Sequence, residues 1–271
     1  MSMYMIGTVA SCSLRTVSGK RERNWKIMRN LRLDICYDGT RYKGWQRLSV
    51  GDSTIQDKLE TTLSRLLNEN IEVSASGRTD AGTHALHQII NFHCESTMSC
   101  EQILDGLRKY LPEDIGVYSC KNVSERFHAR LNAKEKTYRY RIWNSDEPCV
   151  FDRKYVYIDT RNFNLRLMQI AAQQYVGTHD FSAFCGNKKM KKSTVRSIRN
   201  FTIRNENAEI VFEVTGNGFL QHMVRIMVGT LLEVGIGDRA PETISDLFGA
   251  ERAAAGPAVP ACGLCLMEVV Y

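Results

Sequence analysis

The ten-residue segment Ser76–Ala85, SGRTDAGTHA, concentrates side chains that can do chemistry. It carries the carboxylate of Asp80 between Gly77 and Gly82, and the guanidinium of Arg78 two positions earlier. An aspartate near glycine is most often a turn former. In an extended segment, however, residues two apart share a face, which places Arg78 either to favour the ionised form of Asp80 or to hold an anionic ligand beside it. Because a turn does not require this density of Arg, Thr, Asp and His, we predict a reactive carboxylate at Asp80.

A second candidate is an arginine inside a strongly apolar segment. Residues 217–235, NGFLQHMVRIMVGTLLEVG, are apolar around most of a helical circumference, which predicts a buried helix over 219–234. Arg225 lies on the one polar stripe of this helix, and a buried guanidinium without an anion is costly. The partner of Arg225 is therefore either a structural carboxylate in a salt bridge or a catalytic one.

Histidines and cysteines offer weaker candidates for a metal site. His84 lies near the end of the Asp80 segment and His87 and His93 follow it, but strand alternation puts His84 on one face and the other two on the opposite face. Cys262 and Cys265 spell CGLC, and a zinc or redox site would need a second ligand pair or a thioredoxin-like setting. We therefore expect packing cysteines, paired or exposed histidines, no metal and no cofactor.

The composition is that of a folded globular protein. The chain has 271 residues, of which 43% are hydrophobic and 24% charged, and this excludes disordered, collagen-like and disulfide-scaffold chains. Nine cysteines, an odd number, indicate reduced thiols and a cytoplasmic protein. No apolar run approaches the roughly 20 residues that a membrane helix needs, so we expect no contact with a membrane.

Positive charge is concentrated in two stretches. Residues 121–141 hold seven Lys or Arg against two Glu, and residues 186–204 hold seven Lys or Arg and no acid. Such segregation is typical of a surface that follows a phosphate backbone, although two solvated basic faces would give the same pattern. The candidate phosphate contacts in the second stretch are Lys188, Lys189, Lys191 and Lys192.

The remaining pattern predicts an α+β fold with two similar halves. Period-two and helical patterns alternate in the same order twice, which indicates two ferredoxin-like or RRM-like halves with antiparallel sheets, helices on one side and a central cleft for a ligand. Ser53 and Gln56 have capping-box spacing. The expected strands are 31–37, 71–76, 86–94, 115–120, 137–143, 195–203, 209–214 and 264–270, and the expected helices are 55–67, 100–111, 165–175, 219–234 and 241–247. We expect a disordered extension over 1–28, an N-terminal domain over 29–133 with the Asp80 loop, and a C-terminal domain over 134–271.

The segment SGRTDAGTHA resembles the signature of the tRNA pseudouridine synthase A family, and the likeness extends along essentially the whole chain after residue 28. It continues, in the order of the family, through YDGTRYKGWQR (37–47), FHAR (127–130), KTYRYRIWN (136–144), HDFSAF (179–184), the 217–235 segment and GLCLMEVVY (263–271). The resemblance implies the pseudouridine synthase fold. It also implies that Asp80 is the nucleophile, that Arg78 helps to hold the target base out of its helix, that Tyr138 stacks on the uracil, that Arg225 pairs with Asp80, and that Leu266 walls the pocket.

The activity implied by the resemblance suits these residues. Pseudouridine forms when the bond from sugar to base nitrogen breaks and the base rejoins through carbon, so the step needs an ionised carboxylate but no redox cofactor or metal. Attack at the base and action at the sugar both remain open. A glycoside hydrolase, the nearest chemical competitor, generally uses two carboxylates, and no second acid accompanies Asp80 in its loop.

The resemblance further implies a substrate and a partner. It implies modification of tRNA uridines at positions 38, 39 and 40 of the anticodon stem-loop, by a homodimer. The alternative from another class is a tRNA-binding or tRNA-folding protein that keeps the scaffold without turnover.

Overall fold

The computed structural model describes residues 28–49, 53–187 and 189–271. The predicted extension over 1–28 lies outside the described residues, apart from Met28. Elements of the first half are β1 Arg29–Tyr37, α1 Ile55–Leu67, β2 Ser74–Ala75, β3 His84–Cys94, α2 Cys100–Tyr110 and β4 Ile115–Val123. Elements of the second half are β5 Glu135–Trp143, β6 Tyr157–Ile158, α3 Leu165–Gln173, β7 Gly177–Asp180, β8 Val195–Glu206, β9 Glu209–Gly216, α4 Met223–Ile236 and β10 Leu264–Val270, with short 3-10 helices at 182–184, 241–247, 252–254 and 261–263.

The two halves share one strand order. In the first half the order is β4-β1-β3, with β2 paired to the side of β3 that faces away from β1, and in the second it is β10-β5-β9-β8. Matching elements in chain order gives the same arrangement, because β5, α3, β8, β9, α4 and β10 correspond to β1, α1, β2, β3, α2 and β4. The ferredoxin-like α+β class predicted from the sequence is thereby confirmed, and we propose that the halves divide at residue 133 as predicted, between β4 and β5.

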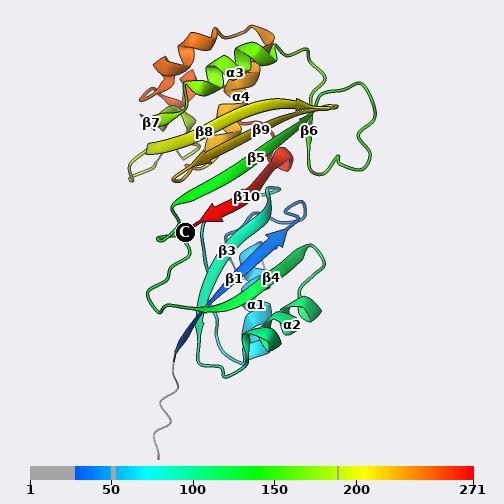
Figure 1. Ribbon diagram of the computed structural model, residues 1–271, viewed down its shortest axis with the longest axis vertical. Coiled ribbons are helices and arrows are strands. Elements are labelled where there is room, and N and C mark those ends of the chain that lie inside the picture. The colour runs from blue at the N-terminus through cyan, green and yellow to red at the C-terminus, as the bar shows by residue number, and fades with distance from the viewer. Residues whose placement is uncertain (1–27, 50–52, 188) are drawn as a thin grey trace, which may run out of the picture.

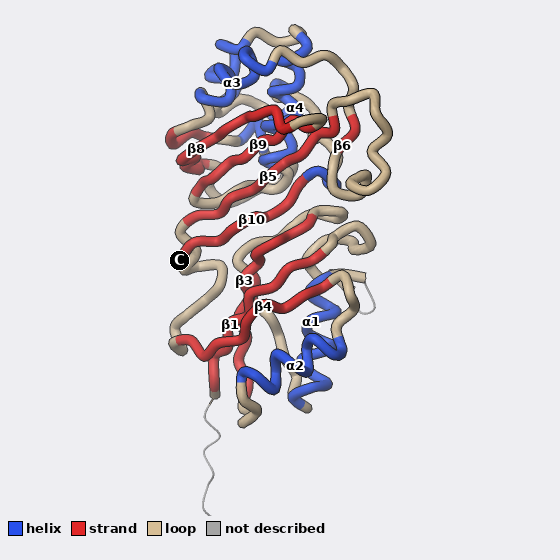
Figure 2. The backbone as a smooth tube through the Cα atoms, turned by 45° about the vertical axis from the view of Figure 1, so that its right-hand side comes forward, coloured by secondary structure: helices blue, strands red, loops and turns tan. Residues whose placement is uncertain are grey.

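A single sheet runs through both halves. Pairing within each ferredoxin-like core is antiparallel, as expected, but β3 and β10 pair in parallel, with His84 opposite Cys265 and Ala85 opposite Leu266. Strand β10 thus lies at the waist of the molecule between β3 and β5, with α1 and α2 below it and α3 and α4 above it in the view (Figure 1). The described residues form one sheet of ten strands where the sequence predicted two. Figure 2 shows β8, β9, β5 and β10 side by side above the strands of the first half.

Helix α1 starts where its apolar face begins, but a different residue caps it. Thr54, and not the predicted pair Ser53 and Gln56, occupies the cap, because its hydroxyl accepts a hydrogen bond from the Asp57 N–H at 3.3 Å. The side chain of Gln56 instead accepts from the Arg47 N–H at 3.2 Å. The helix therefore helps to fix the segment that precedes it.

Helix α4 is the buried helix predicted around Arg225, but it begins later than predicted. His222 lies in the left-handed region, with φ of 60°, so Gln221 and His222 form a turn and the helix runs over Met223–Ile236. Apart from Arg225, Glu233 and Ile236, its residues are buried. The predicted helix over 241–247 is a 3-10 helix. Among the described residues, no helix combines the length and apolar character needed to cross a bilayer.

Candidate active site

The loop that carries Asp80 connects β2 to β3 and is held by the segment after β1. Tyr37 and Thr79 share a hydrogen bond between their hydroxyls at 2.8 Å, and the Trp45 N–H donates to the Thr79 carbonyl at 3.0 Å. Within the loop, the Thr83 N–H donates to the Asp80 carbonyl at 3.1 Å. The backbone on both sides of Asp80 is therefore fixed.

Two glycines permit this close contact. A Cβ at Gly39 would lie 2.0 Å from the Thr83 carbonyl oxygen, and one at Gly44 would lie 2.9 Å from the Thr79 carbonyl oxygen. Gly44 also has φ of +95°, which residues with a Cβ rarely adopt. The glycines of the YDGTRYKGWQR motif thus allow its backbone to pack directly against the Asp80 loop.

The start of the same loop is fixed from β3 and β5. Gln88, fully buried, accepts a hydrogen bond from the Ser76 hydroxyl and donates its amide to the Gly77 carbonyl at 3.0 Å. The ammonium of Lys136 donates to the Ser76 carbonyl at 2.6 Å. Strands β3 and β5 therefore set the position at which the loop leaves the sheet.

Asp80 forms an ion pair with Arg225 of α4. The Arg225 Nη1 lies 3.1 Å from the Asp80 Oδ2, and the Arg225 Nε donates to the Val259 carbonyl at 2.7 Å. The side chains of Arg225 and Asp80 are 16% and 24% exposed, so the pair is shielded while the carboxylate stays accessible. His222 Nε2 lies 3.5 Å from the other carboxylate oxygen, Oδ1.

Arg78 does not share this contact. Its side chain is exposed and forms no ion pair with Asp80 or with another residue in the described part of the chain. The first alternative for Arg78, direct support of the ionised Asp80, is therefore wrong, because Arg225 takes that position. The second alternative, contact with a ligand, stays a prediction.

Tyr138 lies on β5, on the face covered by the second-half helices. Its ring meets Phe219 edge to face, with centroids 5.1 Å apart, and the residue is only 7% exposed. Burial, reinforced by the charges of Tyr37 and Asp80, raises the pKa of Tyr138, so the phenol is neutral. Leu266, fully buried, stands opposite Tyr138 in the pairing of β10 with β5.

The predicted lysine loop begins beside the site. The Gly186 N–H donates to the Gln221 carbonyl at 2.8 Å, next to His222. Lys189, Lys191 and Lys192 are exposed, whereas Lys188 lies outside the described residues. Exposed lysines at this position are suitable for contact with a polyanion.

The three histidines after the Asp80 loop have separate partners. Their nitrogens lie near three different carboxylates: His84 with Asp38 at 3.2 Å, His87 with Asp34 at 3.3 Å, and His93 with Glu125 at 3.3 Å. Over residues 28–49, 53–187 and 189–271, no group of three or more His, Cys, Asp or Glu is arranged to hold a metal ion. The thiols of Cys262 and Cys265 lie against backbone carbonyls.

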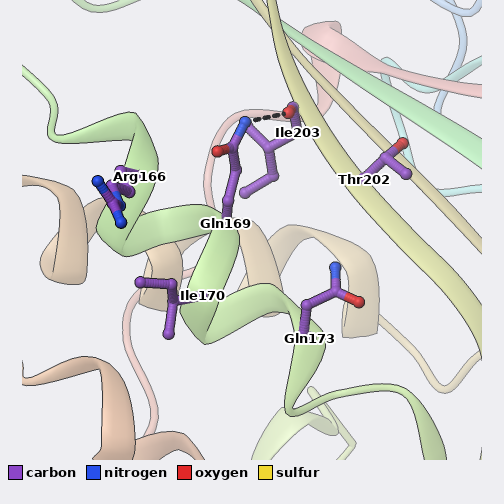
Figure 3. A pocket seen from close by; sticks show the side chains of 6 residues that line it. All are labelled: Arg166, Gln169, Ile170, Gln173, Thr202 and Ile203. Atoms are coloured by element: carbon purple, nitrogen blue, oxygen red, sulfur yellow. Dashed lines mark hydrogen bonds between the residues drawn. The ribbon is translucent and has the colours of Figure 1, made fainter.

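Surface hollows elsewhere do not coincide with Asp80. Figure 3 shows one between α3 and β8, where the Gln169 amide donates to the Ile203 carbonyl at 2.9 Å. It is lined by Arg166, Gln169, Ile170, Gln173, Thr202 and Ile203. A second hollow lies against α4 and residues 257–260 and also lacks Asp80. The candidate site is therefore defined by the Asp80 and Arg225 contact and not by these hollows.

Sequence reasoning missed several residues around Asp80. The contact of His222 with the carboxylate had no signal beyond its position on the polar stripe of the 217–235 segment. Lys136 could have been found, since it stands two residues before Tyr138 and shares its strand face. Gly39 and Gly44 were visible within their motif, but their close approach to the Asp80 loop depends on tertiary structure.

Comparison with known proteins places this chain in an enzyme class. A sequence profile described as tRNA pseudouridine synthase matches residues 35–132 and 171–271. The "tRNA pseudouridine synthase A" of Bacillus sp. (strain KSM-64) is 44% identical over 244 residues, covering 90% of this chain and 100% of that protein. The "tRNA pseudouridine synthase A 1" of Clostridium tetani (strain Massachusetts / E88) is 47% identical over 245 residues, again covering 90% and 100%.

A solved structure titled "Crystal Structure of a Cbf5-Nop10-Gar1 Complex" also matches, with a TM-score of 0.35, 10% identity, and coverage of 87% of this chain and 48% of that one. The class defined by the profile and the relatives is that of enzymes that isomerise uridine in tRNA. Within it, the chain belongs to the tRNA pseudouridine synthase A family.

Proposed function

We propose that Asp80 is the nucleophile that converts uridine to pseudouridine at positions 38, 39 and 40 of the tRNA anticodon stem-loop. The observation that carries this proposal is the ion pair of Asp80 with Arg225, in a loop clamped on both sides. Asp80 is the acid of the motif on which the family resemblance rests, and it is both shielded and accessible.

The chemistry needs few groups. The bond between N1 and C1′ breaks, a bond between C5 and C1′ forms, C5 loses its proton and N1 gains one, so the atoms of the nucleotide are conserved. Attack by Asp80 on the base and attack on the sugar both require an ionised oxygen. Arg225 binds one oxygen through a single nitrogen, which leaves lone pairs of the carboxylate for the reacting atom.

The base must leave its helix before it can react. Unstacking a base costs a few kcal/mol, and stacking on an aromatic ring recovers part of this cost. We assign the stacking surface to Tyr138, which is held edge to face by Phe219. Leu266 forms the apolar wall beside it, and exposed Arg78 helps to hold the target base out of its helix.

Lys189, Lys191 and Lys192, with Lys188, are proposed to contact tRNA phosphates without selecting a base. The homodimer is proposed from the resemblance alone. A mass in solution of about twice the chain's 30.9 kDa would support the dimer, and a mass equal to one chain at the enzyme's working concentration would contradict it.

The test of the position assignment is a map of pseudouridine in tRNA. Cells that lack this gene should lose pseudouridine at positions 38, 39 and 40, and expression of the parent, but not of Asp80→Asn, should restore it. Restoration by Asp80→Asn would remove Asp80 from its role. Unchanged pseudouridine in the deletion strain would contradict the position assignment, and a parent protein that binds tRNA without turnover would support the scaffold alternative.

A further inference from the structure

Three cations from the two basic stretches meet beside the candidate site. Lys136 and Arg130 come from residues 121–141 and Arg196 from residues 186–204, and both arginines lie close enough to Lys136 to lower its pKa. We call Lys136, Arg130 and Arg196 the cation cluster. The fold therefore brings the two basic stretches together beside the candidate site.

The cluster adjoins both the Asp80 loop and the proposed stacking ring. Lys136 shares its strand face with Tyr138, and its ammonium donates to the Ser76 carbonyl at 2.6 Å. A Cβ placed on Gly77 would lie 3.5 Å from the Lys136 Nζ and 4.0 Å from the Tyr138 hydroxyl. Lys136 and Tyr138 thus both lie beside Gly77, at the start of the loop.

Arg196 lies beside Gly218, next to the residue that packs on Tyr138. A Cβ placed on Gly218 would lie 3.8 Å from the Arg196 Nε, and the next residue, Phe219, packs against the ring of Tyr138. The Arg196 Nη1 donates to the carbonyls of Ser193 and Val195 at 2.9 and 2.6 Å, which fixes the guanidinium locally.

The cluster lacks an anion of its own. None of its three members forms an ion pair with a carboxylate in the part of the chain that the structure describes, and the acid next to Lys136, Glu135, binds Arg199 at 2.9 Å. Burial, together with the charges of Arg130 and Arg196, lowers the pKa of Lys136 to about 8. Clustered cations repel one another and are costly to bury, so a ligand of opposite charge is expected to complete the site.

We propose that the cation cluster is the receptor for one backbone phosphate of the RNA, the phosphate on one side of the target uridine. The ammonium of Lys136 has three donors and uses one on Ser76, so two remain for the phosphate. Because the same ammonium binds the loop that carries Asp80, the phosphate and the nucleophile are positioned from one side chain. This inference rests on the proposed function of Asp80 and Tyr138.

The sharpest test pairs single phosphates with single side chains. Synthetic tRNA would carry one neutral methylphosphonate at the phosphate 5′ or 3′ of the target uridine, or at a distant stem position. Its dissociation constant would be measured with the parent, Lys136→Met, Arg196→Gln and the matched control Lys109→Met. Lys109 is an exposed lysine in the last turn of α2.

At one flanking phosphate, we expect the effects of the methylphosphonate and of Lys136→Met on tRNA affinity not to be additive. Neutralising that phosphate should weaken binding to the parent about tenfold, Lys136→Met should weaken binding of unmodified tRNA by a similar factor, and the two together should cost no more than either alone. The slope of log affinity against log salt should also fall by about 0.7 to 0.9 for Lys136→Met. Lys109→Met should behave as the parent with every RNA.

Additive losses at both flanking phosphates would overturn the proposal, and so would a Lys136→Met protein with the parent's affinity and salt slope. Arg196→Gln gives an independent reading of the same coupling if Lys136→Met fails to fold. The proposal would also be contradicted if free inorganic phosphate competed with tRNA but the side chains showed no coupling to either flanking phosphate. If the parent makes no pseudouridine in unmodified tRNA, the proposed function is wrong. If the parent makes pseudouridine but neither Lys136 nor Arg196 is coupled to a flanking phosphate, only the phosphate proposal is wrong.

Discussion

The substitution Gly39→Ala should damage catalysis from outside the reacting groups. The added Cβ would meet the Thr83 carbonyl oxygen at 2.0 Å, so the two must separate by roughly 1 Å or more before the contact becomes tolerable. Thr83 is bonded through its N–H to the Asp80 carbonyl, and the displacement therefore reaches the nucleophile. A misplacement of about 1 Å at a reacting group can cost about 100-fold, or roughly 2.7 kcal/mol of barrier.

The assay is single-turnover conversion of tRNA uridine, with tRNA affinity and the thermal unfolding midpoint measured on the same samples. We expect Gly39→Ala to lose about 100-fold in rate and about 1–3 kcal/mol in stability, with tRNA affinity little changed. The control is Gly237→Ala at the end of α4, where φ is +88° and the added Cβ meets nothing within 4 Å. That control should lose stability by about 1 kcal/mol and keep the parent's rate. A Gly39→Ala rate within threefold of the parent would refute the reasoning.

Three further outcomes can be measured on purified variants. In a double-mutant cycle of unfolding free energies, Asp80→Asn and Arg225→Met should show a coupling of about 1–3 kcal/mol, between the values for exposed and fully buried pairs, and a coupling near zero would contradict the shielded ion pair. Tyr138→Leu should weaken tRNA binding relative to Tyr138→Phe by about 1–3 kcal/mol, and equal affinities would argue against stacking. For Lys136, a folded-state pKa of about 8 against the ordinary value of 10.5 means that the unfolded chain holds more protons between pH 8 and 10.5. Stability relative to Lys136→Met should therefore rise with pH in that window, by about 3 kcal/mol in all, and a fall would contradict the assignment.

Local sequence patterns predicted much of the fold, because several helices and strands are determined by the apolar face that each one buries. The alternation of β1 and the apolar face of α1 predicted both elements within two residues, since each buries one face. The start of α4 was predicted too early because the left-handed conformation of His222 interrupts an apolar pattern that continues through it. The parallel pairing of β3 with β10 joins residues 181 positions apart in the case of His84 and Cys265, and no local pattern reports such a pairing.

In the candidate site, too, local patterns predicted some features and tertiary structure determined the others. The sequence required an anion for Arg225, but the choice of Asp80, 145 residues away, came from the family resemblance and not from the pattern of either segment. The sequence also placed Lys136 and Arg196 in basic stretches without predicting that they converge. Convergence depends on the order of β5, β9 and β8 in the sheet.

The most direct test of the role of Asp80 is the release of tritium from tRNA labelled at C5 of uridine, compared between the parent and Asp80→Asn. The asparagine preserves the shape of the side chain and removes the charge that pairs with Arg225. We predict that Asp80→Asn binds tRNA with an affinity close to the parent's and releases tritium at least about 1,000-fold more slowly under single-turnover conditions. Release at the parent's rate, from a protein folded as the parent is, would show that the carboxylate of Asp80 is not the nucleophile.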